Sequence, residues 1–164
     1  MKILLAIDGS PCSDAAVNEV ARRPWPQGSM VKVLTALEND PPAPITPEAW
    51  ALPLGYYEEL NEALRKQGRN VVDRALKTLK TNKWFSVDAV LAPGSARPAI
   101  LDEAESWGAD LMVMGSHGYG ALKRFLLGSV SQAVVAHAKC SVEVVRCAPV
   151  EEAVEDPVAA KQKE

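Results

Sequence analysis

The most informative feature of this sequence is a pair of nearby glycines followed by a glycine–serine pair. Gly115 and Gly118 enclose two residues, and nine further residues lead to Gly128 and Ser129. Glycines let a backbone approach a ligand closely, and a helix starting at the glycine–serine pair would present free N–H groups and partial positive charge. The hydroxyls of Ser129 and Ser131 would add donors at the same place. The spacing therefore predicts a site for an anion such as the phosphates of a nucleotide.

The spacing differs from the two best-known phosphate loops. A Walker loop has a lysine after its second glycine, whereas Ala121 follows Gly120 here. The dinucleotide fingerprint has three glycines after the first strand, but Gly118 and Gly120 lead to Lys123 in the third place, late in the chain. Glycines alone would predict only a chain reversal after a strand. The glycine–serine pair at a helix start favours a phosphate site instead.

The elements that position this motif alternate along the chain. Apolar runs predict strands at 3–7, 31–37, 85–91, 111–114 and 142–145, and helical periodicity predicts helices at 13–21, 56–79, 99–107 and 130–137. The buried stripe of the long helix is assigned to Leu60, Leu64, Val71, Val72, Ala75, Leu76 and Leu79. Because continuously apolar strands alternate with helices, we expect an α/β fold. It is a single doubly wound, five-stranded parallel sheet of order 3-2-1-4-5 with helices on both faces.

This strand order brings two separate signals together. A doubly wound sheet binds ligands beyond the carboxyl ends of its strands, where the strand order reverses. The reversal lies between strands one and four. Asp8 ends the first strand and Gly115 ends the fourth. Both signals are therefore expected in one crevice.

Length and composition indicate one domain. The chain has 164 residues, and we expect a domain over 1–147 with a disordered tail at 148–164, where glutamate, alanine and lysine replace aromatic residues. The segment 39–55 contains five prolines, a density that forbids a regular helix or central strand. We interpret it as an irregular surface excursion.

Charge and cysteine usage narrow the function classes. The net charge is −3 and the longest basic cluster is Lys123–Arg124, which argues against nucleic-acid binding. No apolar run approaches the roughly 20 residues of a membrane helix, and the first apolar segment is too short for a signal peptide, so a cytoplasmic location is expected. Cys12, Cys140 and Cys147 lack metal-ligand spacing. We expect reduced thiols and no metal site.

The chain resembles the universal stress protein family, in its nucleotide-binding branch, over residues 1–146. The resemblance is carried by the segments 3–10, 110–118, 128–131 and 137–146. The complete glycine spacing is specific in this family, since members without it generally do not hold ATP. The resemblance therefore implies an ATP-binding, stress-response protein of the adenine nucleotide alpha hydrolase-like fold. Whether Mg²⁺ accompanies the ATP is left open by the resemblance.

The resemblance carries the family's ligand contacts onto nine positions. Asp8 matches the acid that holds the ribose hydroxyls or the adenine edge, Ala36 faces the adenine, and Met114 lies beside the nucleotide. The other positions match the backbone and hydroxyls around ribose and phosphates: Gly115, Gly118, Gly128, Ser129, Val130 and Ser131. Plain structural roles stay open, namely a turn cap for Asp8, core packing for Ala36 and Met114, and capping for Ser131.

The resemblance also implies a homodimer paired through Val142 and Val144 of the fifth strand. Two residues depart from the family pattern. Ser141 replaces the usual proline before this strand, and Glu143 interrupts its apolar run. Charge on an edge strand opposes edge-to-edge pairing.

Three functions compete for this scaffold. The first is a nucleotide-binding regulatory protein whose ATP state alters a surface read by a protein partner. The second is a weak ATPase or an adenylyl-transferring enzyme. The sequence offers no convincing base near the phosphates, no Walker acid and no loop lysine, so we assign no catalytic residue and favour binding with slow or no turnover. The third is a receiver-like module, which needs an acid at the end of strand three. Because Asp88 lies inside that strand, we reject this function.

Overall fold

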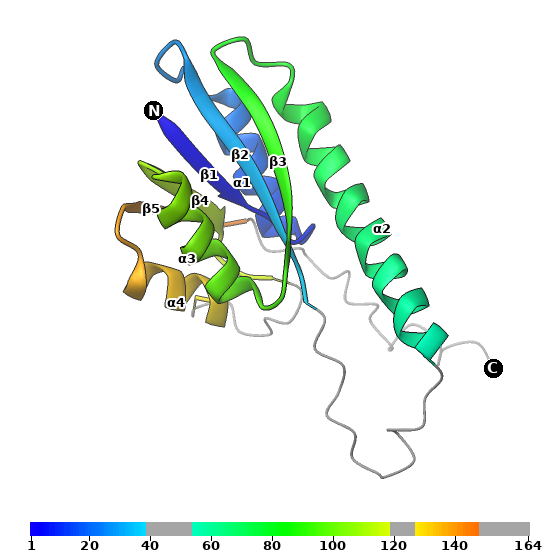
Figure 1. Ribbon diagram of the computed structural model, residues 1–164. Coiled ribbons are helices and arrows are strands. Elements are labelled where there is room, and N and C mark those ends of the chain that lie inside the picture. The colour runs from blue at the N-terminus through cyan, green and yellow to red at the C-terminus, as the bar shows by residue number, and fades with distance from the viewer. Residues whose placement is uncertain (39–53, 119–126, 148–164) are drawn as a thin grey trace, which may run out of the picture.

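The computed structural model describes residues 1–38, 54–118 and 127–147 (Figure 1). The elements in chain order are β1 (Lys2–Ala6), α1 (Pro11–Arg22), β2 (Ser29–Leu37), α2 (Leu54–Leu79), β3 (Phe85–Pro93), α3 (Ala96–Trp107), β4 (Leu111–Gly115), α4 (Ser129–His137) and β5 (Ser141–Val145). The proline-rich segment up to residue 53 and the expected tail at 148–164 lie outside the described residues.

The strands form a parallel sheet in the order β3-β2-β1-β4-β5, which confirms the predicted topology. In the centre of the sheet Leu5 of β1 lies opposite Val33 of β2 on one side and Val113 of β4 on the other. Figure 1 shows α1 and α2 behind and beside the sheet and α3 and α4 in front of it. The strand order therefore reverses between β1 and β4, as a doubly wound sheet requires.

Each face of the sheet has its own apolar core. Residues of β1 alternate between the two, so that Ile3 and Leu5 pack on the side of α1 and α2, while Leu4 packs on the side of α3 and α4. All three side chains are fully buried. Full burial of such a side chain contributes about 1.5–3 kcal/mol. The two cores explain why the strands are continuously apolar.

The turn between β1 and α1 is held by its serines. Ser10 caps α1 by accepting a hydrogen bond from the backbone N–H of Ser13 at 3.3 Å, and Pro11 occupies the first helical position. The Ser13 hydroxyl in turn accepts from the N–H of Gly9 at 3.0 Å, where the backbone has φ of 87°. Only glycine adopts this conformation without strain. The turn places Asp8 at the carboxyl edge of the sheet.

Two details of the expected helices were wrong. Leu60 is 37% exposed and does not belong to a buried stripe, because the N-terminal half of α2 extends past the carboxyl ends of the strands (Figure 1). Helix α3 begins at Ala96 and not at Ala99. Pro98 lies in its first turn, where the missing N–H has no helical partner to lose.

Candidate functional site

A cavity of about 670 Å³ opens at the carboxyl ends of β1, β2 and β4. Its volume lies within the range of about 300–1,000 Å³ that is usual for small-molecule and cofactor sites. The nine site residues predicted from the sequence all line it: Asp8, Ala36, Met114, Gly115, Gly118, Gly128, Ser129, Val130 and Ser131. The structure therefore brings together, at the predicted switch point, residues from four separate stretches of the chain.

Asp8 has both a structural role and a position on the cavity wall. Its Oδ1 accepts a hydrogen bond from the backbone N–H of Ser10 at 2.9 Å, which is the turn-capping role left open by the sequence. A Cβ atom placed on Gly118 would lie 2.5 Å from the other carboxylate oxygen, Oδ2. Gly118 belongs to the segment that runs from the last residue of β4 into the loop after it (residues 115–118, the β4 loop). The glycine therefore leaves room for the carboxylate at the cavity.

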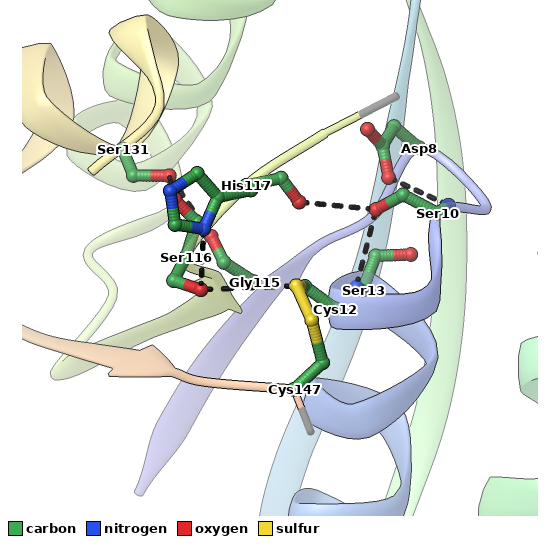
Figure 2. Close-up of a disulfide and its surroundings, with 9 residues drawn as sticks. All are labelled: Asp8, Ser10, Cys12, Ser13, Gly115, Ser116, His117, Ser131 and Cys147. Atoms are coloured by element: carbon green, nitrogen blue, oxygen red, sulfur yellow. Dashed lines mark hydrogen bonds between the residues drawn. A yellow bond between two sulfur atoms is a disulfide. The ribbon is translucent and has the colours of Figure 1, made fainter. Parts of the chain in front are cut away.

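Hydrogen bonds from three elements hold the β4 loop. The hydroxyl of Ser10, before α1, donates to the carbonyl of His117 at 3.2 Å (Figure 2). The N–H of Ser116 donates to the carbonyl of Val145 in β5 at 2.8 Å. The N–H of Gly128, before α4, donates to the carbonyl of Ser116 at 2.8 Å. The loop is thus a pre-organised part of the cavity wall.

Gly115 has a packing role that the sequence analysis missed. A Cβ atom at this position would lie 2.7 Å from the carbonyl carbon of Cys12 and 2.8 Å from the backbone nitrogen of Ser13. These are backbone atoms of the first turn of α1, which cannot step aside as a side chain can. The absence of a side chain at Gly115 lets α1 touch the end of β4.

Ser131 is buried, and its hydroxyl contacts backbone carbonyl groups of the β4 loop. The hydroxyl donates to the carbonyl of Gly115 at 2.9 Å and lies 3.3 Å from the carbonyl of Ser116. It thereby ties α4 to the β4 loop. Ser129, by contrast, is exposed at the helix start that Gly128 caps. The first turn of a helix leaves backbone N–H groups without helical partners, so this end of the cavity can receive an anion.

One wall of the cavity was not found from the sequence. Helix α2 contributes four residues at the spacing of a single helix face: Leu64, Gln67, Gly68 and Val71. That spacing is visible in the sequence and could have identified them, once α2 was known to extend past the strands. The other lining residues that the sequence analysis did not assign to the ligand are Ala6, Ile7, Ser13, Leu34, Thr35, Leu37, Glu38, Ala96, Ile100, His117 and Leu127.

Thr35, one of these additional lining residues, has a buried side-chain hydroxyl. Its side-chain oxygen is buried, and within the described ranges it has no hydrogen-bond partner. A buried hydroxyl without a partner costs about 1–3 kcal/mol. The cavity is therefore bordered by a residue whose buried hydroxyl has no partner within the described ranges.

The cysteines correct one expectation. Cys12 and Cys147 form a disulfide, with their Cα atoms 4.6 Å apart, whereas the sequence analysis expected reduced thiols throughout. The two lie 135 residues apart in the chain and meet because the end of β5 lies beside the first turn of α1. Cys140 is a free cysteine, and burial raises the pKa of its thiol. In the part of the chain that the structure describes, no cluster of three metal-ligating side chains occurs.

Glu143 of β5 forms an ion pair with Arg23, the residue that follows α1. Its carboxylate accepts two hydrogen bonds from the guanidinium of Arg23, at 2.6 and 2.8 Å. Arg23 also pairs with Glu19 at 2.7 Å. Hydrogen bonding of its guanidinium to the Glu143 carboxylate is the main cause that raises the pKa of Arg23 above its usual value. The charge that interrupts the fifth strand is therefore neutralised within the subunit.

Fold and site together define an α/β protein with a ligand cavity at the switch point of its sheet. The model of the universal stress protein family matches residues 1–146, and the chain belongs to this family. Universal stress protein YxiE of Bacillus subtilis is 29% identical over 88% of this chain and 98% of its own. A Staphylococcus epidermidis protein named for the same family is 32% identical over 98% of this chain and 92% of its own.

Solved structures share the fold. Hypothetical protein MJ0577 superposes with a TM-score of 0.76 at 27% identity, covering 90% of this chain and 96% of that one. An Arabidopsis thaliana family member with AMP bound has a TM-score of 0.61 at 17% identity, covering 92% and 97%. A universal stress protein in complex with cAMP has a TM-score of 0.57 at 20% identity, covering 88% and 95%. Among the described residues, no helix has the length and apolar character needed to cross a membrane.

Proposed function

We propose that the cavity binds an adenine nucleotide, with ATP as the principal ligand, and that the protein is a nucleotide-dependent regulatory module with slow or no turnover. One observation carries this proposal. The nine residues matched to nucleotide contacts come from separate stretches of the chain, and all of them line one cavity. In this proposal residues 1–147 form the domain, and the module acts in the cytoplasm on a protein partner.

The lining of the cavity suggests which residues contact each part of the nucleotide. The start of α4 at Gly128 and Ser129 suits the phosphates, because helix N-termini attract anions. Ala36 and Met114 offer an apolar surface to the base, and Asp8 offers carboxylate oxygens to ribose hydroxyls or an adenine edge. Two fold neighbours are named for bound AMP and cAMP, ligands of the same class.

The identity of the ligand is tested by mass spectrometry of small molecules released from freshly purified, denatured protein. We expect an adenine nucleotide in near-stoichiometric amount, and its mass separates ATP from ADP and AMP. Phosphate release from added ATP, with and without Mg²⁺, then tests the alternative of a weak ATPase or an adenylyl-transferring enzyme. Purified protein that neither carries nor binds any adenine nucleotide would contradict the proposal.

We expect Asp8→Ala to weaken ATP binding by about 10- to 150-fold, which corresponds to the roughly 1.5–3 kcal/mol of hydrogen bonds to a charged acceptor. Inorganic triphosphate should lose much less affinity, because Asp8 is assigned to the nucleoside and not to the phosphates. Calorimetric titration with both ligands measures the difference. Asp8→Asn is the matched control, since its amide oxygen can still accept the 2.9 Å hydrogen bond from Ser10. Equal weakening of ATP and triphosphate would mean that Asp8 acts only through its turn.

We also propose that the protein forms a homodimer through the open edge of β5, at Val142 and Val144. β5 pairs with β4 on one side and ends the sheet on the other. The carboxylate of Glu143 is bound by Arg23, so it does not present an unpaired charge to a second copy. Backbone polar groups of successive residues point to opposite sides of a strand, and the carbonyl of Val145 faces β4. The N–H of Val144 therefore faces the open edge.

We expect Val144→Pro to convert the dimer to a monomer, because proline removes this edge N–H. Light scattering over a range of concentrations measures the mass. Val144→Ala is the matched control, since it keeps the N–H and should stay dimeric. A monomeric wild-type protein, or a dimer that tolerates Val144→Pro, would show that β5 is not the interface.

A further inference from the structure

We propose that the Cys12–Cys147 disulfide is a reversible lock that holds the β4 loop in the wall of the cavity, closed by oxidation and opened by a dithiol reductant. The bond joins the first turn of α1 to a residue two positions beyond β5. Figure 2 shows it with Ser116 to its left, His117 above and to the left, and Asp8 and Ser10 above and to the right. Its position couples a redox reaction to the site.

The disulfide crosslinks two elements that hold the same loop. From α1's side, Ser10 donates to the carbonyl of His117 at 3.2 Å. From β5's side, the carbonyl of Val145 accepts from the N–H of Ser116 at 2.8 Å. The Ser116 hydroxyl also lies 3.7 Å from Cys12 Sγ, as a hydrogen-bond donor to it. With the bond closed, neither element can leave the β4 loop independently of the other.

Helix α1 and the β4 loop are in close backbone contact. A Cβ atom at Gly115 would lie 2.7 Å from the carbonyl carbon of Cys12. The backbone of the residue that carries the sulfur is therefore packed directly on the backbone that begins the loop. A displacement of Cys12 reaches the cavity wall without passing through flexible side chains.

The two sulfurs differ in a way that sets the direction of the reaction. Cys12 is 5% exposed, whereas Cys147 is half-buried and more accessible. We infer that a thiolate of the reductant attacks Cys147 Sγ, the S–S bond breaks, and Cys12 leaves as a thiolate. The second thiol of the reductant then releases Cys147. The protein gains two electrons and two protons, and the reductant becomes a disulfide.

The surroundings of Cys12 stabilise the leaving thiolate. Cys12 lies in the first turn of α1, where free N–H groups and the helix dipole favour negative charge on sulfur. Ser116 donates to the sulfur, and Nδ1 of His117 lies 3.0 Å from the Ser116 hydroxyl, so that a protonated Nδ1 completes a chain of donors. In reoxidation the more accessible Cys147 thiolate attacks a disulfide such as oxidised glutathione and releases one glutathione thiolate, and the Cys12 thiolate then attacks Cys147 Sγ and displaces the second.

A lock of this kind suits the proposed cytoplasmic location. Disulfides in reducing compartments are usually transient and redox-sensing. Opening the bond frees the end of β5 from α1, so the β4 loop loses a constraint on the side of Val145. We infer that the oxidised form binds ATP more tightly than the reduced form. This last consequence rests on the proposed function, while the lock on the loop does not.

Thiol counting tests the bond. After treatment with oxidised glutathione and removal of the excess, the denatured wild-type chain should show one reactive thiol, from Cys140, and after dithiothreitol all three. Peptide mapping should find Cys12 joined to Cys147. Three reactive thiols in the oxidised sample, or a different pairing, would overturn the proposal.

Hydrogen exchange without any nucleotide tests the coupling. On reduction, the amides of Ser116 and Gly128 should exchange about 10-fold faster, because local opening is favoured when a constraint is lost. The amide of Ile7, bonded to Leu34 inside the sheet at 2.9 Å, is the reference and should not change. Cys147→Ser should show the reduced behaviour in either redox state. Cys140→Ser should keep the full response, and unchanged exchange in the wild-type protein would overturn the lock.

ATP titration of both redox forms separates this proposal from the proposed function. We expect about 10-fold weaker binding after reduction, with no redox effect in Cys147→Ser. If exchange responds to reduction but neither form binds ATP, the lock stands and the nucleotide proposal fails. If both forms bind ATP equally, the coupling to the ligand is refuted, and the exchange data decide whether the loop is locked at all.

Discussion

Gly118→Val should lower ATP affinity by at least about 100-fold while the protein stays folded. A Cβ atom at this position would lie 2.5 Å from Asp8 Oδ2, the far end of a side chain that can swing away. The carboxylate therefore moves, and the valine methyl groups fill part of the space assigned to ribose and phosphates. Calorimetric titration measures the affinity, and thermal unfolding monitored by circular dichroism measures stability.

A double-mutant comparison shows whether the valine acts through Asp8. In an Asp8→Ala background, Gly118→Val should cost less affinity than in the wild-type background, because residues in contact are not additive. Gly128→Val should also lower ATP affinity by at least about 100-fold. Its Cβ would lie 3.4 Å from the His117 Cα and the Ser116 carbonyl oxygen, which is ordinary contact with backbone atoms, so the protein should stay folded. ATP affinity that is unchanged in folded Gly118→Val would refute the assignment of the β4 loop to the ligand.

The parts of the structure that follow from local pattern could be predicted from the sequence. Alternating apolar strands and helices predicted the parallel sheet, since each strand must be buried on both faces, and the expected strand order is the one observed. The order alone then placed Asp8 and Gly115 at one switch point, and both line the cavity. These predictions needed only periodicity, the expected strand order and the rule that ligands bind at strand ends.

The parts that depend on how far elements extend could not be predicted in this way. Periodicity placed Leu60 and Leu64 on one stripe of α2, but it does not say where the sheet beneath that helix ends. Beyond the strands the same stripe faces solvent at Leu60 and the cavity at Leu64. The Cys12–Cys147 pair is invisible for a related reason, because it depends on the end of β5 meeting the start of α1.

Close backbone approach is the other feature that sequence patterns miss. It predicts that Gly115→Ala causes the largest loss of stability among substitutions that add a single methyl group at the site. We expect the free energy of unfolding to fall by about 3 kcal/mol, the upper part of the range for overpacking a core. The added Cβ would lie 2.7, 2.8 and 2.9 Å from backbone atoms of Cys12 and Ser13. Relief requires moving the whole first turn of α1. Urea unfolding of the oxidised protein measures the change.

Gly68→Ala is the matched control, because it introduces the same methyl group at the same shortest distance. Its Cβ would lie 2.7 Å from Leu37 Cδ2 and 3.2 Å from Leu91 Cδ2, which are the ends of flexible side chains. Replacing glycine by alanine inside α2 also gains about 1 kcal/mol of helix propensity. The two effects oppose each other, so this variant should unfold within about 1 kcal/mol of the wild-type protein. If Gly115→Ala were no more destabilising than Gly68→Ala, the contact of α1 with β4 would be compliant. The β4 loop would then need another source of its rigidity.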